Sequence, residues 1–124
     1  MKIEIIAHDG KKAEMVQFLM KHIEVFKSKN IKLVATGTTG KHAQQSGLEV
    51  ERYESGPLGG DAQIAADVVN GKIQMVLFFR DPLGKHPHEP DILMLMRICD
   101  VRNVPIATNP ATAEMLIKGI EKLG

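Results

Sequence analysis

Two glycine-rich segments of this chain carry groups that suit the binding of an anion. The first is Thr36-Gly37-Thr38-Thr39-Gly40, and the second is Ser55-Gly56-Pro57-Leu58-Gly59-Gly60-Asp61. Glycine lets backbone N–H groups approach an anion closely, hydroxyl groups add donors, and a following helix N-terminus favours negative charge. The first segment is not the phosphate loop of ATPases, because no Gly-Lys-Ser/Thr follows it. Both segments are candidate phosphate-binding loops, and the alternative for the first is a threonine helix cap with a turn glycine.

Three charged residues are further candidates: Asp61 at the end of the second segment, and Asp9 and Lys12 near the start of the chain. Asp61 ends the second segment, where it would place a carboxylate beside the bound phosphate. Its local pattern alone favours a helix cap, and Asp9 presents the same choice before the first predicted helix. Lys12 is placed to reach a phosphate, although a single lysine is by default a solvated surface residue.

The stretch His86-Pro87-His88-Glu89-Pro90-Asp91 is the most unusual in the chain. Its two histidines and its terminal aspartate suggest a metal site, but the prolines restrict how the loop wraps an ion and no third histidine is near. A neutral histidine that donates a hydrogen bond to a carbonyl oxygen is the favoured role. His22 and His42 are predicted to be surface residues, and Arg80 is expected to pair with an acid or with a neighbouring subunit.

The elements that must position these groups alternate between strand-like and helix-like patterns. The predicted strands are Ile3–Ala7, Ile31–Ala35, Leu48–Tyr53, Ile73–Phe79 and Val104–Ala107. The predicted helices are Lys11–Lys27, a short one from Thr38-Thr39 to Ser46-Gly47, Asp61–Val69, Asp91–Asn103 and Ala111–Leu123. This alternation predicts an α/β fold, a Rossmann-like doubly wound sheet of about five mainly parallel strands with helices on both faces.

The polar segments follow the predicted strands directly. Ala7-His8-Asp9-Gly10, the two glycine-rich segments and Arg80-Asp81-Pro82 each come just after a strand. Because ligands bind at the carboxyl edge of open α/β sheets, we expect the four loops to form one crevice.

The bulk composition bounds the class of protein. A length of 124 residues fits one domain, 1–124, and 16 basic against 15 acidic residues leave a net charge of +1. With so small a charge and with no Trp, one Tyr and four Phe, no nucleic-acid or membrane partner is expected. Cys99 lies in an apolar run and is predicted to be a buried hydrophobe rather than a nucleophile. The chain start is too weakly apolar for a secretory signal, so we expect a cytoplasmic location.

Taken together, the motifs resemble the methylglyoxal synthase family, in the same order and with nearly the same spacing over almost the whole chain. The motifs that carry the resemblance are Ala7-His8-Asp9, the segments 36–40 and 55–61, Phe78-Phe79-Arg80-Asp81-Pro82-Leu83, Pro87-His88-Glu89-Pro90-Asp91 and Ala107-Thr108-Asn109.

The resemblance implies a lyase that converts dihydroxyacetone phosphate to methylglyoxal and inorganic phosphate, with no metal and no organic cofactor. It implies that Asp61 is the base and that His88 polarises the substrate carbonyl and moves protons among the oxygens. The substrate- and phosphate-binding positions it implies are His8, Lys12, Thr36, Gly37, Thr38, Thr39, Ser55 and Gly56, with Asp9, Asp81 and Asp91 as supporting acids.

The resemblance also implies a homohexamer, with phosphate as product and candidate inhibitor. Family members commonly carry a segment beyond the last helix, and in some members it contains an Arg. This chain stops at Gly124, so phosphate regulation and subunit contacts that depend on that segment are not expected here. The chief rival is a non-catalytic phosphate-sensing domain of the carbamoyl phosphate synthetase type, which needs the anion loops but not the acid–base set. A zinc hydrolase that uses His86, His88 and Asp91 is a third hypothesis.

Overall fold

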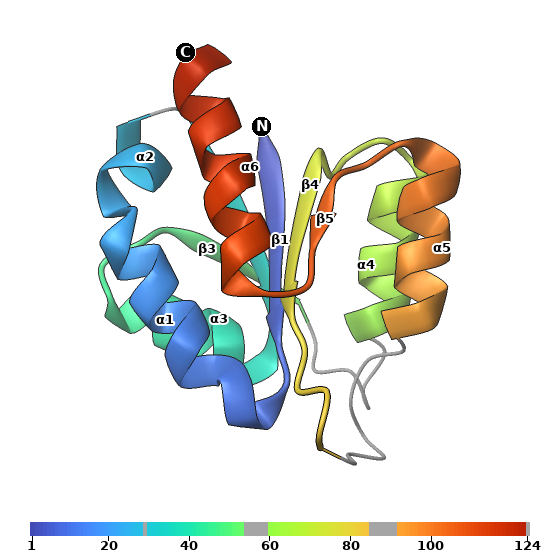
Figure 1. Ribbon diagram of the computed structural model, residues 1–124, viewed down its shortest axis with the longest axis horizontal. Coiled ribbons are helices and arrows are strands. Elements are labelled where there is room, and N and C mark those ends of the chain that lie inside the picture. The colour runs from blue at the N-terminus through green and yellow to red at the C-terminus, as the bar shows by residue number, and fades with distance from the viewer. Residues whose placement is uncertain (29, 54–59, 85–91, 124) are drawn as a thin grey trace.

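The chain folds into three layers, with one sheet between two groups of helices (Figure 1). The computed structural model describes residues 1–28, 30–53, 60–84 and 92–123, without the side chains of Ser28, Thr38, Asp61 and Leu123. The strands are β1 (Lys2–Ala7), β2 (Lys32–Thr36), β3 (Val50–Tyr53), β4 (Met75–Phe79) and β5 (Ile106–Ala107). The helices are η1 (Asp9–Lys11), α1 (Lys12–Lys21), α2 (Ile23–Ser28), α3 (Gly37–Gln45), α4 (Gly60–Val69), α5 (Ile92–Arg102) and α6 (Pro110–Leu123).

The strands pair in parallel throughout, in the order β3-β2-β1-β4-β5. The predicted doubly wound parallel sheet with helices on both faces is therefore confirmed. The chain leaves α3 and α4 through Gly47 and Gly71, whose φ angles are 91° and 74°. These are left-handed conformations that glycine adopts without steric cost, as expected at helix ends.

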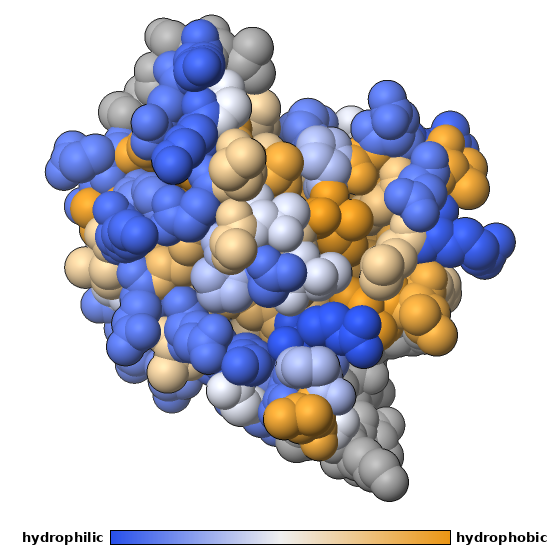
Figure 2. All heavy atoms as spheres, viewed as in Figure 1, coloured by the Kyte–Doolittle hydropathy of each residue, from blue (hydrophilic) through white to orange (hydrophobic). Residues whose placement is uncertain are grey.

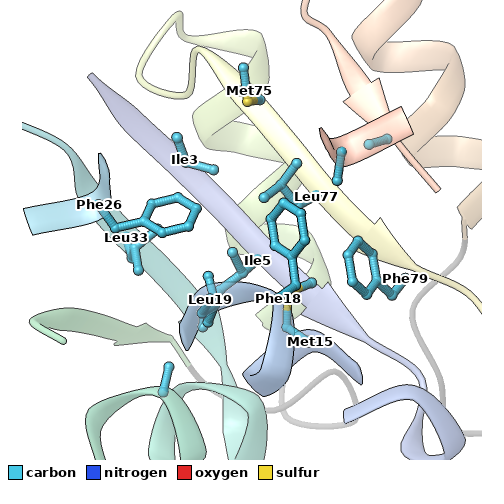
Figure 3. Packing of buried hydrophobic residues seen from close by; sticks show 14 of the residues in the cluster. Ile3, Ile5, Met15, Phe18, Leu19, Phe26, Leu33, Met75, Leu77 and Phe79 are labelled. Carbon is cyan, nitrogen blue, oxygen red and sulfur yellow. The ribbon is translucent and has the colours of Figure 1, made fainter. Parts of the chain in front are cut away.

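Alternate residues of each strand supply two separate cores. Ile3 and Ile5 of β1 pack with Phe18 of α1, with α2 and α3, and with α6 on one face, and Figure 3 shows the aromatic and aliphatic side chains that meet there. Ile6 packs on the other face against α4 and α5. All five residues of β4 are buried, as is typical of a central parallel strand that helices cover on both faces.

Cys99 belongs to the second core and is fully buried, as predicted. Burial, and then the nearby charge of Asp100, raise the pKa of its thiol to about 11. The thiol therefore stays protonated near neutral pH and is a poor nucleophile.

The first predicted helix, Lys11–Lys27, is broken in the structure into η1, α1 and α2. The break falls at His22, which was predicted to lie on the surface, and that prediction is wrong. The His22 side chain is only 12% exposed, with Nε2 2.8 Å from Glu114 Oε1 of α6 and its ring 4.7 Å from that of Phe18. The helical pattern indicates which face is buried but does not reveal that α6 crosses at this turn. His42 is exposed, as expected.

One carboxyl group lies inside the second core. Glu4, in the middle of β1, is fully buried between Val34 and Val76, and neither of its carboxyl oxygens has a hydrogen-bond partner among the described residues. Burial first, and then the negative charges of Asp67 and Glu51, raise the pKa of Glu4 well above its ordinary value. The uncharged acid is therefore the form that the fold stabilises.

Replacing Glu4 by Gln is expected to flatten the pH dependence of stability. Because the pKa of Glu4 is higher in the folded than in the unfolded chain, the stability that Glu4 contributes is greatest at low pH. It is lost as the pH rises through the folded pKa, by up to about 1.4 kcal/mol per pH unit. Denaturant unfolding between about pH 5 and about pH 9 measures this slope. Glu49→Gln, which removes an exposed carboxylate that is not among the causes of the raised Glu4 pKa, is the control and should keep the slope. Equal slopes in the wild type and Glu4→Gln would refute the assignment.

Candidate active site

All five strands of the sheet end at one edge, because they all run in the same direction. This edge lies at the bottom of the view in Figure 1, where β1 leads into η1. The strand order reverses at β1, which has β2 on one side and β4 on the other. Open α/β sheets bind ligands in the crevice at such a switch point.

The segment Thr36–Gly40 joins β2 to α3 at this edge. Gly37 has a φ of 50°, so the turn glycine of the sequence analysis is confirmed. Thr36 is the N-cap residue of α3, but its side chain makes no capping hydrogen bond. The structure therefore does not support a cap by the Thr36 hydroxyl. Thr36 and Thr39 are 8% and 3% exposed. The N-terminus of the nine-residue helix α3 thus meets the edge with the partial positive charge that suits an anion.

His8 follows β1 and is held across the switch point by β4 and the residues after it. Its backbone N–H donates to Phe79 O at 3.1 Å, and the Asp81 N–H donates to His8 Nδ1 at 2.8 Å. Because a backbone amide can only donate, Nδ1 must be unprotonated, so the ring is neutral with its proton on Nε2. In this state the ring offers one N–H donor to a neighbouring acceptor.

Asp81 shapes the turn that presents this amide. Its Oδ1 accepts hydrogen bonds from the backbone N–H groups of Leu83 and Gly84, at 3.0 and 3.1 Å. Its Oδ2 lies so close to Gly10 that a Cβ there would be 2.9 Å away. The loops after β1 and β4 therefore interlock through Asp81 and Gly10.

Asp9 and Lys12 form an ion pair beside His8, with Asp9 Oδ1 2.7 Å from Lys12 Nζ. The N-cap of α1 is Lys11, so Asp9 does not cap that helix and instead begins η1. The structure thus brings together His8, Asp9, Lys12 and Asp81, with the Thr36–Gly40 segment at the neighbouring strand end.

The other predicted site residues are not placed in this way. Ser55, Gly56, His86, His88 and Asp91 lie outside the described residues. Asp61 is the second residue of α4, but its side chain is not among those that the structure describes. The roles of base and of helix cap both stay predictions for Asp61. The described chain resumes at Gly60 after the first of these segments and stops at Gly84 before the second.

Arg80 was predicted to pair with an acid or with a neighbouring subunit. Among the described residues no carboxylate pairs with its guanidinium, and Arg80 lines a cleft of about 380 Å³ with Lys11, Thr108 and Asn109.

No group of His, Cys, Asp or Glu in the described part of the chain is arranged to hold a metal ion. In the same part, no helix is both long and apolar enough to cross a membrane.

Arg52 of β3 also lies at this edge, although no sequence motif marked it as a candidate. Its Nη2 donates to Gly37 O at 3.3 Å, inside the Thr36–Gly40 segment. The alternation of faces along β3 places Arg52 on the side of α3, but only the folded structure shows which backbone group it reaches.

The fold and these loops define a parallel α/β domain whose candidate site lies at the switch point of the sheet. Residues 14–108 match the family model described as MGS-like domain. Proteins named methylglyoxal synthase from Borreliella afzelii (strain PKo) and Lysinibacillus sphaericus (strain C3-41) are 54% and 53% identical over 123 residues. These residues are 98% of this chain and 95% and 90% of the two relatives. The crystal structure of methylglyoxal synthase from Elizabethkingia anophelis NUHP1 is 40% identical, with a TM-score of 0.87 over 94% of this chain and 76% of that one. The chain belongs to the methylglyoxal synthase family.

Proposed function

We propose that this chain, as one domain spanning residues 1–124, converts dihydroxyacetone phosphate to methylglyoxal and inorganic phosphate. The observation that carries the proposal is the similarity, 54% identity over 98% of the chain, to a protein named methylglyoxal synthase. The described groups at the switch point suit such a substrate, because they combine a helix N-terminus, a lysine and a neutral histidine donor.

The reaction begins with the removal of a proton from the hydroxymethyl carbon by the carboxylate of Asp61. A carboxylate, with an ordinary pKa of about 3.9, is a weak base for carbon, so the enediolate must be stabilised as it forms. Neutral His88 donates a hydrogen bond to the developing oxyanion and moves protons between the oxygens. The enediolate electrons then expel phosphate, and the released enol tautomerises to methylglyoxal.

Phosphate leaves only if its ester C–O bond stands perpendicular to the enediolate plane. Loops that grip the phosphate from two sides set this angle. In this proposal the grip comes from Lys12 and Thr36–Thr39 on one side and from Ser55 and Gly56 on the other. His8 binds the substrate through Nε2–H, and Asp9, Asp81 and Asp91 support these groups.

The proposal extends to assembly and location. We expect a cytoplasmic homohexamer that uses neither metal nor organic cofactor and is inhibited by its product phosphate. Leu93 and Val101 of α5 are each 73% exposed, and Figure 2 shows hydrophobic side chains at the surface over this helix. Exposed apolar side chains of this kind support a subunit contact.

Incubation of the purified protein with dihydroxyacetone phosphate, with and without a chelator, tests the proposal. Equal release of methylglyoxal and phosphate, unaffected by chelator, is expected. Phosphate binding without turnover would instead indicate a sensing domain of the carbamoyl phosphate synthetase type. Loss of activity with chelator would favour the zinc hypothesis.

Gly10→Ala is expected to lower kcat/KM by about ten- to a hundredfold. Its Cβ would lie 2.9 Å from Asp81 Oδ2, so the Asp81 carboxylate must shift, and we expect the turn that it holds through Oδ1, with the amide that bonds His8, to shift with it. Gly119→Ala is the matched control, since nothing lies within 4 Å of its Cβ position in α6. Steady-state kinetics on both variants measures the effect. Full activity in Gly10→Ala would show that the interlocked turn is dispensable.

A further inference from the structure

Arg52 contacts the anion segment at a backbone carbonyl. Its Nη2 donates a hydrogen bond of 3.3 Å to Gly37 O, where the chain passes from β2 into α3. Arg52 is paired in register with Ala35 of β2, whose side chain lies in the core on the α3 side of the sheet. The strand register therefore places the Arg52 side chain next to the first turn of α3.

A second contact involves the aliphatic stem of the same side chain. A Cβ built on Gly40 would lie 2.9 Å from Arg52 Cγ and 3.3 Å from Ala35 Cβ. The stem thus occupies the space that any larger residue at position 40 would need. Arg52 holds the first turn of α3 at two points, the carbonyl of Gly37 and the bare Cα of Gly40.

These contacts restrain a segment that is otherwise easily deformed. Two of its five residues are glycines, which lose the most conformational freedom on folding, and Gly37 has a φ of 50°. Because the peptide unit is planar, fixing the Gly37 carbonyl also fixes the Thr38 N–H, which points the opposite way. That amide is among the N–H groups in the first turn of α3 that have no hydrogen-bond partner within the helix.

We propose that Arg52 is a positioning residue that holds the Thr36–Gly40 segment in the orientation in which its N–H groups bind the substrate phosphate. This inference rests on the proposed role of that segment in phosphate binding. The planar guanidinium suits the task, because it can bond a carbonyl while its stem packs along the helix.

Arg52→Met tests the proposal, because it keeps most of the stem and removes the hydrogen bond and the charge. The dissociation constant for inorganic phosphate, by titration calorimetry, and KM are each expected to rise about tenfold, with kcat changed by less than about twofold. Lys41→Met removes an equal charge from an exposed position on α3 and should change both constants by less than about twofold. Gly40→Ala, whose Cβ displaces the stem, should weaken phosphate binding like Arg52→Met and serves if that variant does not fold.

The outcomes separate this inference from the proposed function. If the wild type turns over substrate and Arg52→Met binds phosphate as tightly as the wild type does, the proposed role of Arg52 is overturned and the proposed function is not. An equal loss in Lys41→Met would also overturn it, since general charge would then explain the effect. Wild-type protein that binds no phosphate would overturn the proposed function and this inference with it.

Discussion

Asp61→Asn is expected to reduce kcat by about 10²–10⁴-fold while the protein keeps its fold. The substitution removes the proposed base and changes the side-chain volume very little. Asp61 lies in the first turn of α4, where losing the carboxylate removes only a helix-dipole interaction of about 0.3–1 kcal/mol, so secondary structure and thermal unfolding should stay close to those of the wild type.

The rate of methylglyoxal formation at saturating substrate measures this effect. Asp100→Asn is the control, because it removes the same charge from an exposed position on α5 and should leave kcat unchanged. Phosphate affinity in Asp61→Asn should also be preserved. If the variant turned over as fast as the wild type, a different group would have to remove the proton.

The second large effect is expected at His88. His88→Asn should lower kcat by about a hundredfold or more, because the donor that stabilises the oxyanion would be displaced and could no longer carry protons. The affinity for inorganic phosphate should change little, since other groups hold that part of the substrate.

His42→Asn, at an exposed histidine of α3, is the matched control and should have wild-type kinetics. Measuring kcat and phosphate binding on the same samples separates two roles for His88. A parallel loss of turnover and phosphate affinity would assign His88 to binding the phosphate rather than to catalysis.

Much of the fold was predictable because it depends on local pattern. The strand predicted at Ile73–Phe79 is found as β4, and the helix end predicted at Ser46-Gly47 coincides with the left-handed backbone of Gly47. Parallel pairing then placed His8 and the Thr36–Gly40 segment at neighbouring strand ends of a single edge. Periodicity and chain direction were enough for these conclusions.

Contacts between elements could not be predicted in the same way. The burial of His22 depends on Glu114, which is 92 residues away in the chain, and the role proposed for Arg52 depends on which carbonyl it reaches. Glu4 was included in the predicted strand Ile3–Ala7, but that prediction did not show that its carboxyl group is fully buried with a raised pKa. Each of these features arises where two elements meet, and the pattern of one element does not specify its neighbour.

The most direct test of the account is a crystal structure with a stable mimic of the enediolate bound. The Asp61 carboxylate should then lie within about 3.5 Å of the carbon that loses its proton, with the phosphate ester bond out of the enediolate plane. An Asp61 side chain directed away from the ligand, with that carbon facing another group, would contradict the proposed mechanism.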